Sequence, residues 1–269
     1  MRRGAILLVL SLAGQAFGQD NSGLDLLTTR DDLRGWEPVG RVDIENGGFC
    51  TGTLIAADLV LTAAHCVIDA DGSPVDAGRI TFRAGFADGL SLTEAAVVRT
   101  IVPPGYRRIE PAPAEVIRLD VALLQLGKAI PSAVISPFAV ALPGAGAEVS
   151  IVSYAAGRED ALSWQRVCKV LARQDALIAV DCDVTYGSSG APVLDRSGYR
   201  AKIVSIISAG SSVDGKAVAI GMELPAVVDA LKAALRRGEA TSEVPQPETN
   251  VKRIIVGGGD DIGARFVSP

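Results

Sequence analysis

Short apolar stretches alternate with turn residues over most of the chain, and this pattern predicts strands. Eight stretches rich in Val, Ile, Leu and Thr are expected as strands: Gly52–Ile55, Leu59–Leu61, Ile80–Ala84, Ala95–Ile101, Val121–Leu126, Glu148–Tyr154, Ala176–Asp181 and Lys202–Ile207. Turn-forming pairs such as Asp71-Gly72 and Asp88-Gly89 separate them. Regular short strands with such turns indicate an all-β barrel or sandwich and argue against βαβ units.

One helix is expected near the end of the chain. Apolar residues recur at helical spacing between Pro225 and Arg237, and they are Val227, Val228, Leu231 and Leu235. Proline suits the first turn of a helix, so the helix is expected to begin at Pro225. Beyond Gly238 the segment Glu239–Asn250 is rich in Pro, Glu, Thr and Ser, which is typical of a linker.

The first 18 residues have the pattern of a secretory signal peptide. Arg2 and Arg3 precede the short apolar run Ala5–Ala13, and Ala16-Phe17-Gly18 is a small-x-small cleavage site. Prolines interrupt the longest later stretch without charge, so no membrane anchor is expected. The protein is therefore expected to be secreted or periplasmic, where an oxidising environment makes its cysteines candidates for disulfides.

The charge balance and the residue counts narrow the chemistry. The 269 residues carry 26 Lys+Arg and 31 Asp+Glu, which argues against nucleic acid as the main partner because phosphate binding needs clustered basic residues. The chain has one histidine, His65, and four cysteines, none of them in a Cys-x-x-Cys pair. A histidine-rich metal site or a structural zinc site is therefore not expected. Any chemistry that uses imidazole must use His65.

Three short patterns carry the candidate chemistry. In chain order they are Leu61-Thr62-Ala63-Ala64-His65-Cys66, Leu119-Asp120-Val121-Ala122-Leu123-Leu124 and Gly187-Ser188-Ser189-Gly190-Ala191-Pro192. Each resembles a signature of the chymotrypsin-like (trypsin-like) serine proteases, and the order His, Asp, Ser is the order of that family. The G-x-S-G-x-P form of the third pattern is similar to the bacterial secreted branch. The resemblance implies an all-β fold of two six-stranded antiparallel β-barrels with a C-terminal helix.

The resemblance implies a catalytic role for one residue of each pattern. A serine hydroxyl is a poor nucleophile, so Ser189 needs His65 to take its proton and later return it to the leaving amine. A carboxylate, Asp120, would orient the imidazole and stabilise its charged form. The amides of Gly187 and Ser189 would bind the developing oxyanion.

The same resemblance suggests how the chain is divided. Residues 1–18 are expected as the signal peptide and 19–35 as an N-terminal extension or propeptide. Residues 36–130 would form the first barrel with His65 and Asp120, and residues 131–237 the second barrel with Ser189 and the helix. Residues 238–269 would be a linker and a C-terminal tail. Whether the tail, 251–269, docks on the body or acts as a separate recognition segment is left open by the sequence.

Two further features follow from comparison with the family pattern. The resemblance implies the disulfides Cys50–Cys66 and Cys168–Cys182, which is one of three possible pairings. Ser188 stands where trypsin has an aspartate that receives the new N-terminal ammonium after activation, and serine cannot form that ion pair. Activation by insertion of a new N-terminus is therefore not expected.

The specificity of the site has two interpretations. Asp183 lies six residues before Ser189, the spacing at which trypsin carries the acid of its specificity pocket, so a buried carboxylate there would select Arg or Lys. Alternatively, Asp183 pairs locally or caps a turn. Glutamate-specific members usually use a second histidine, which this chain lacks. The segment Ser208-Ala209-Gly210 resembles the strand that pairs with substrate, so Ser208 and Gly210 are expected to bind the substrate backbone.

The main hypothesis is a monomeric secreted serine endopeptidase that acts on proteins or peptides, with an Arg/Lys preference if Asp183 lies in the pocket. This hypothesis needs no metal and no organic cofactor. The alternative from another class is a catalytically silent binding protein on the same fold. A third hypothesis, an esterase, predicts ester turnover without peptide cleavage.

Overall fold

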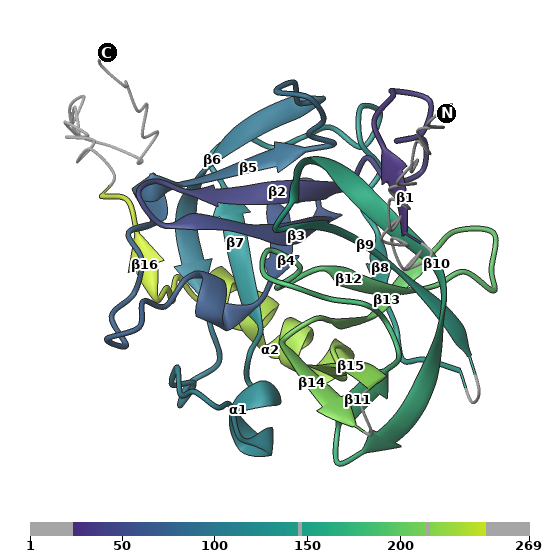
Figure 1. Cartoon of the computed structure of the whole chain (residues 1–269). Helices are drawn as coiled ribbons and strands as arrows, with labels where there is room; N and C mark the ends of the chain where they lie inside the picture. The colour runs from purple at the N-terminus through teal and green to yellow at the C-terminus, as the bar shows by residue number, and fades with distance from the viewer. Residues whose placement is uncertain (1–23, 145–146, 214–215, 246–269) are drawn as a thin grey trace, which may run out of the picture.

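The computed structural model describes residues 24–144, 147–213 and 216–245, which fold into two β-sheets and a C-terminal helix (Figure 1). The expected signal peptide, 1–18, and the tail, 251–269, lie outside the described residues. The strands between residues 39 and 126 form one sheet, and most of the later strands form the other together with the strand at residues 24–27. The double barrel with a C-terminal helix that the resemblance implies is confirmed in outline.

The first sheet closes into a barrel of six strands. Its members are β2 (Val39–Ile44), β3 (Gly48–Ala56), β4 (Leu59–Thr62), β5 (Ile80–Ala84), β6 (Thr93–Ile101) and β7 (Ala122–Leu126), with β16 (Ser242–Glu243) added beside β6. The pairing order is β16-β6-β5-β2-β3-β4-β7, and pairing of β6 with β7 closes the ring. Alternate residues of β5 are buried, as a strand with one face toward a core requires.

The second sheet has nine strands rather than the six that the resemblance implies. They are β1 (Leu24–Leu27), β8 (Ala139–Val140), β9 (Glu148–Ala155), β10 (Arg158–Gln174), β11 (Leu177–Val180), β12 (Pro192–Asp195), β13 (Lys202–Ile206), β14 (Ala209–Val213) and β15 (Lys216–Met222). The order is β14-β15-β11-β10-β9-β12-β13-β8, and β1 pairs with β10. β1 and the two-residue β8 account for two of the three extra strands, and the seven strands β9 to β15 remain without them.

Both ends of the described chain are strands. β1 belongs to the predicted N-terminal extension, yet Leu27 and Leu33 of this region are buried in the core. β16 lies in the segment predicted as a linker, and that prediction is wrong for residues 241–244. The Thr241 and Val244 amides donate to the carbonyls of Thr100 and Val98, so this segment covers the edge of β6 (Figure 1).

The helix α2 (Pro225–Arg236) matches the expected helix to within one residue. Its buried residues are Val228, Leu231, Ala234 and Leu235, and they join a cluster that includes residues of both sheets, such as Leu123 and Leu162. Tyr154 and Phe86 also join the sheets, because the Tyr154 hydroxyl donates to the Phe86 carbonyl at 2.8 Å. One core therefore holds the two sheets against each other.

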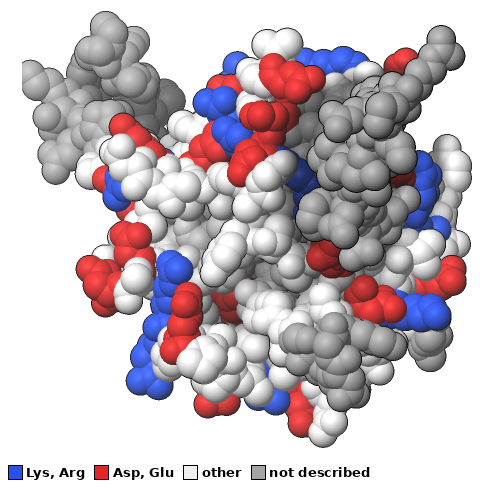
Figure 2. All heavy atoms as spheres, in the orientation of Figure 1, with Lys and Arg blue, Asp and Glu red and all other residues white. Residues whose placement is uncertain are grey.

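The remaining helices are short. They are α1 (Ala114–Ile117) and the 3₁₀ turns η1 (Ala64–Cys66) and η2 (Ala77–Arg79). Within the described ranges, no helix combines the length and the apolar character needed to cross a bilayer. Figure 2 shows basic and acidic side chains intermixed over the face that it draws.

Each of the eight expected strands overlaps an observed one, and Ile80–Ala84 coincides with β5. The largest element that the pattern did not predict is β10, which has 17 residues. Its second half is mostly exposed and carries several charged side chains, so it lacks the apolar run by which the other strands were found.

Candidate active site

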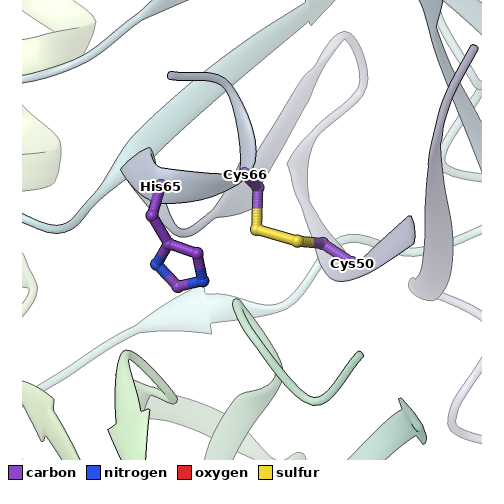
Figure 3. A group of neighbouring side chains, drawn as sticks. All are labelled: Cys50, His65 and Cys66. Carbon is purple, nitrogen blue, oxygen red and sulfur yellow. A yellow bond between two sulfur atoms is a disulfide. The ribbon is translucent and has the colours of Figure 1, made fainter. Parts of the chain in front are cut away.

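His65 lies at the end of the first barrel's β4, in the short turn η1. The disulfide between Cys50 and Cys66 ties this turn to β3, beside the imidazole (Figure 3). The three side chains place a nitrogen and two sulfurs within 4.8 Å of one another, as a metal site would require. Because both sulfurs are consumed in the disulfide, they cannot act as thiolate ligands, and we interpret the group as a brace for His65.

Asp120 holds His65 by two hydrogen bonds. The His65 amide donates to Asp120 Oδ1 at 2.8 Å, and His65 Nδ1 lies 2.7 Å from Asp120 Oδ2. Asp120 is only 3% exposed and precedes the buried strand β7, whereas the imidazole keeps about a fifth of its surface open. The imidazole is therefore fixed at one nitrogen, and its other nitrogen is available to a reacting group.

Ser208 gives Asp120 a further partner from the second barrel. Its hydroxyl donates to Asp120 Oδ2 at 2.5 Å. Burial is the largest influence on the pKa of Asp120 and raises it, but the hydrogen bonds and charge of His65 and the bond from Ser208 outweigh it and hold the pKa below its usual range. Asp120 is thus a carboxylate at neutral pH, although it is buried.

Two residues near this pair were not found from the sequence. Arg108 donates from Nη1 to the carbonyls of His65 and Ile68, at 3.2 and 3.1 Å, and so supports the turn from outside. Burial, followed by the charge of Asp120, raises the pKa of Tyr106, so its phenol stays neutral beside the carboxylate. Neither residue lies in a recognisable motif, and only the folded loop brings them to the site.

The Ser189 loop packs directly on the first barrel. Gly190 has φ +76°, and a β-carbon there would collide with Thr62 and Thr51, so this approach needs glycine. The Thr51 amide donates to the Ser189 carbonyl at 2.9 Å, and the Thr51 hydroxyl donates to the Gly187 carbonyl at 2.9 Å. Thr51, which the sequence analysis did not single out, therefore fastens the serine loop beside the strand end that leads to His65.

The backbone around Ser189 leaves two amides free. Neither the Gly187 nor the Ser189 amide donates a hydrogen bond to another residue in the described part of the chain. Gly187 has φ +89°, a conformation that favours glycine. Two unpartnered amides in one tight turn are suited to binding an oxyanion. Over the same residues, no hydrogen bond joins the Ser189 hydroxyl to His65, a contact that often tightens only when substrate binds.

Ser188 is fully buried, and within the described residues the partners of its hydroxyl are uncharged. Its hydroxyl contacts Ser153 Oγ at 3.4 Å and accepts from the Thr185 amide at the same distance. An uncharged hydroxyl cannot form an ion pair with an N-terminal ammonium, so the absence of activation by N-terminal insertion stays a prediction.

The predicted specificity residues have different surroundings. Asp183 is exposed, not buried, so the condition stated for an Arg/Lys pocket is not met by its side chain alone. Its backbone amide donates to Gln165 Oε1 at 2.8 Å. Gly210 is exposed on β14, which ends the pairing order of the second sheet and so offers an open edge to a peptide.

The second cysteine pair, Cys168–Cys182, joins β10 to the segment that enters the Ser189 loop. The two cysteines of this pair are 14 positions apart, against 16 for Cys50–Cys66. Because one disulfide joins the His65 turn to β3 and the other joins β10 to the segment before Ser189, each anchors a different part of the site. Both pairs are those that the resemblance implies.

A double β-barrel with a histidine–carboxylate pair on one half and a glycine-flanked serine on the other defines a class, the serine-type endopeptidases. The family model of the trypsin-like peptidase domain matches residues 50–200, more than half of the chain, and the chain belongs to that family.

Two solved structures are similar to this chain. One is a Glu endopeptidase in complex with MPD, with 22% identity and a TM-score of 0.66, covering 79% of this chain and 96% of that chain. The other is the protease Anisep from Arthrobacter nicotinovorans, with 18% identity and a TM-score of 0.58, covering 72% and 93%. At these identities the likeness concerns the fold alone.

Proposed function

We propose that this protein is a secreted serine endopeptidase whose catalytic residues are His65, Asp120 and Ser189. The observation that carries the proposal is the buried Asp120 carboxylate bonded twice to the only histidine of the chain, with the Ser189 loop packed on the same strand end. The substrates are proteins or peptides, and the protein acts as a monomer.

The reaction is acyl transfer. The Ser189 oxygen attacks the peptide carbonyl carbon while its proton passes to His65, and the amides of Gly187 and Ser189 bind the oxyanion. The C–N bond then breaks, and His65 returns the proton to the leaving amine. Water, deprotonated by His65, hydrolyses the acyl-enzyme and regenerates Ser189.

A covalent serine probe tests the catalytic part of the proposal. A fluorophosphonate is expected to label the wild type and not Ser189→Ala, with Ser197→Ala, an exposed hairpin serine, as the matched control that still labels. Wild type that is folded but not labelled would favour the silent binding protein. Labelling with turnover of esters but not of peptides would favour the esterase.

The secreted location and the domain limits belong to the same proposal. We expect residues 1–18 to be removed and residues 24–35 to stay in the mature enzyme, because β1 pairs with β10 and Leu33 is buried. The intact mass of the exported protein decides between a start at Gln19 and a start at Trp36, the latter being the result if 19–35 is a propeptide.

The Arg/Lys preference is the finer part of the hypothesis and rests on Asp183. It has less support than the catalytic roles, since Asp183 is exposed and the half-buried Arg158 lies within its electrostatic range. A cleavage profile over peptides that differ in the residue before the scissile bond measures this preference directly.

A further inference from the structure

Thr51 is a fully buried polar residue of β3 whose side chain bonds to the other barrel. Its hydroxyl accepts a hydrogen bond from the Tyr154 amide of β9 at 3.0 Å. The same hydroxyl lies 2.9 Å from the Gly187 carbonyl oxygen and 3.4 Å from the Tyr154 carbonyl oxygen. Because a hydroxyl has one proton to donate, the shorter contact assigns that proton to Gly187. A side chain of the first barrel therefore holds the backbone of the Ser189 loop in the second.

The peptide unit that carries the Gly187 amide is held at its other end. Its carbonyl belongs to Tyr186 and accepts from the Ala156 amide at 2.7 Å. Of the described peptide bonds only Glu110–Pro111 is cis, so this unit is trans, and its carbonyl and its N–H point in opposite directions. The bond from Ala156 to Tyr186 therefore sets the direction in which the free Gly187 N–H points.

Gly187 joins the two peptide units whose carbonyls are held in this way. It has φ +89°, and glycine has more accessible backbone conformations than any other residue. Its own conformation therefore depends on the two bonds that hold the carbonyls before and after it. The Ser189 amide differs, because the Ser188 carbonyl of its peptide unit accepts from the Ala191 amide, two residues further along the same loop, at 2.9 Å. Of the two free amides, that of Gly187 is the one whose direction depends on residues outside the loop.

We propose that Thr51 is a positioning residue whose hydroxyl keeps the Gly187 amide directed at the oxyanion that forms when Ser189 attacks. This inference rests on the proposed endopeptidase function. Donors of this kind stabilise charge that develops only in the transition state, so a bond that orients the donor acts on kcat more than on KM. The positioning has to be accurate, because a misplacement of about 1 Å can lower a rate about 10²-fold.

The first experiment compares Thr51→Val with Thr51→Ser. Valine has nearly the shape of threonine but no hydroxyl, whereas serine keeps the hydroxyl. With active sites counted by fluorophosphonate labelling, Thr51→Val is expected to lower kcat roughly tenfold and to change KM less than about twofold. Thr51→Ser should restore most of kcat. The matched control is Thr53→Val, which should keep the wild-type kcat. Thr53 is a fully buried threonine of the same strand, and over the described residues its hydroxyl has no hydrogen-bond partner.

A second measurement separates orientation of the Gly187 amide from general support of the loop. When a peptide trifluoromethyl ketone binds, the Ser189 oxygen bonds to the ketone carbon, the serine proton passes to His65, and the ketone oxygen becomes an oxyanion. The corresponding peptide alcohol cannot form this adduct. Thr51→Val should weaken inhibition by the ketone roughly tenfold, as it lowers kcat, and should leave inhibition by the alcohol unchanged.

Ala156→Pro keeps the proposal testable if Thr51→Val does not fold. Ala156 is exposed and lies in the turn between β9 and β10, before Gly157, which has φ +77°. Proline suits the position before such a glycine in a tight turn, but it lacks the N–H that binds the Tyr186 carbonyl. This variant should therefore lower kcat and weaken inhibition by the ketone in the same way.

Three results would overturn the inference. The first is a Thr51→Val variant with wild-type kcat and wild-type inhibition by the ketone. The second is equal weakening of the ketone and the alcohol, which would make Thr51 a general brace for the loop. The third is a Thr51→Val variant that does not fold, together with an Ala156→Pro variant of wild-type kcat. Absence of labelling in folded wild type is a different failure, that of the endopeptidase function itself.

Discussion

Two carboxylates, Asp120 and Asp183, belong to the predicted site residues, and their surroundings are opposite. Asp120 is 3% exposed and accepts hydrogen bonds from the His65 amide, the His65 ring and Ser208. Asp183 is exposed, and its own amide, not its carboxylate, is what the neighbouring Gln165 binds. A buried charge must be saturated with partners to be tolerated, whereas an exposed one can be left to water and a distant cation. Asp120 is therefore fixed as the hydrogen-bond partner of His65, whereas the role of Asp183 depends on which groups approach its exposed carboxylate.

The largest effect is expected from removing the charge of Asp120. Asp120→Asn should lower kcat/KM by about 10³- to 10⁴-fold, because the amide leaves His65 in the wrong tautomer and its protonated form unsupported. Peptide hydrolysis, corrected for folded protein, measures the loss. The matched control Asp229→Asn changes an exposed residue of α2 and should retain wild-type activity. A loss of less than about tenfold would remove Asp120 from the catalytic set.

The two disulfides brace different segments of the candidate active site. Replacing either cysteine pair by serine should cost roughly 3 kcal/mol of stability, since the loops are of similar length. Loss of Cys50–Cys66 should also lower kcat, because it frees the turn that holds His65. Loss of Cys168–Cys182 should act on substrate preference. Urea unfolding together with kinetics on the folded variants checks this, and identical kinetic profiles for the two would contradict it.

Ser208→Ala tests how completely Asp120 must be partnered. The variant removes one of its three donors, and loss of a hydrogen bond to a charged group costs about 1.5–3 kcal/mol. We expect kcat to fall roughly tenfold with little change in KM, because the bond positions the carboxylate. Ser211→Ala, an exposed change on the neighbouring strand β14, is the control. A change confined to KM would instead favour direct substrate binding by the Ser208 side chain.

The smallest expected effect is on the stability of the folded protein at acidic pH. The folded pKa of Asp120 is held below its usual value, so its contribution to stability is present above the unfolded pKa of about 4 and is lost as the pH falls through the lower folded value. The difference in unfolding midpoint between the wild type and Asp120→Asn should therefore shrink as the pH is lowered from 7 toward 3. A difference that stays constant over this range would show that Asp120 does not titrate in this way.

The fold was predictable to the extent that strands bury one continuous face. The segment Ile80–Ala84 alternates buried and half-buried residues, and α2 repeats its apolar residues at helical spacing. β10 and β16 were not predictable, because their exposed residues carry charge and their hydrogen bonds depend on distant strands. Pairing of Ser242 with Thr100 joins residues far apart in the chain, which no local pattern encodes.

The candidate site, like the fold, contains residues that the sequence predicted and residues that only the structure reveals. His65, Asp120 and Ser189 lie in short motifs because the local backbone, such as the positive φ of Gly190, constrains their neighbours. Thr51 and Arg108 lie in no motif, since any donor at the correct place in space would do. They hold the loops of Ser189 and His65 through bonds to backbone carbonyls.

The sequence by itself determined the family, the all-β architecture, the C-terminal helix and the candidate base, since a chain with one histidine leaves no other choice. Only the tertiary structure decided that Asp120 is buried among donors whereas Asp183 is exposed. Ser208 and Asp120 are 88 positions apart, and they meet because the second sheet packs against the first. Burial and hydrogen bonding depend on distance in space and not on spacing along the chain, so the surroundings of the two carboxylates could not be predicted from the sequence.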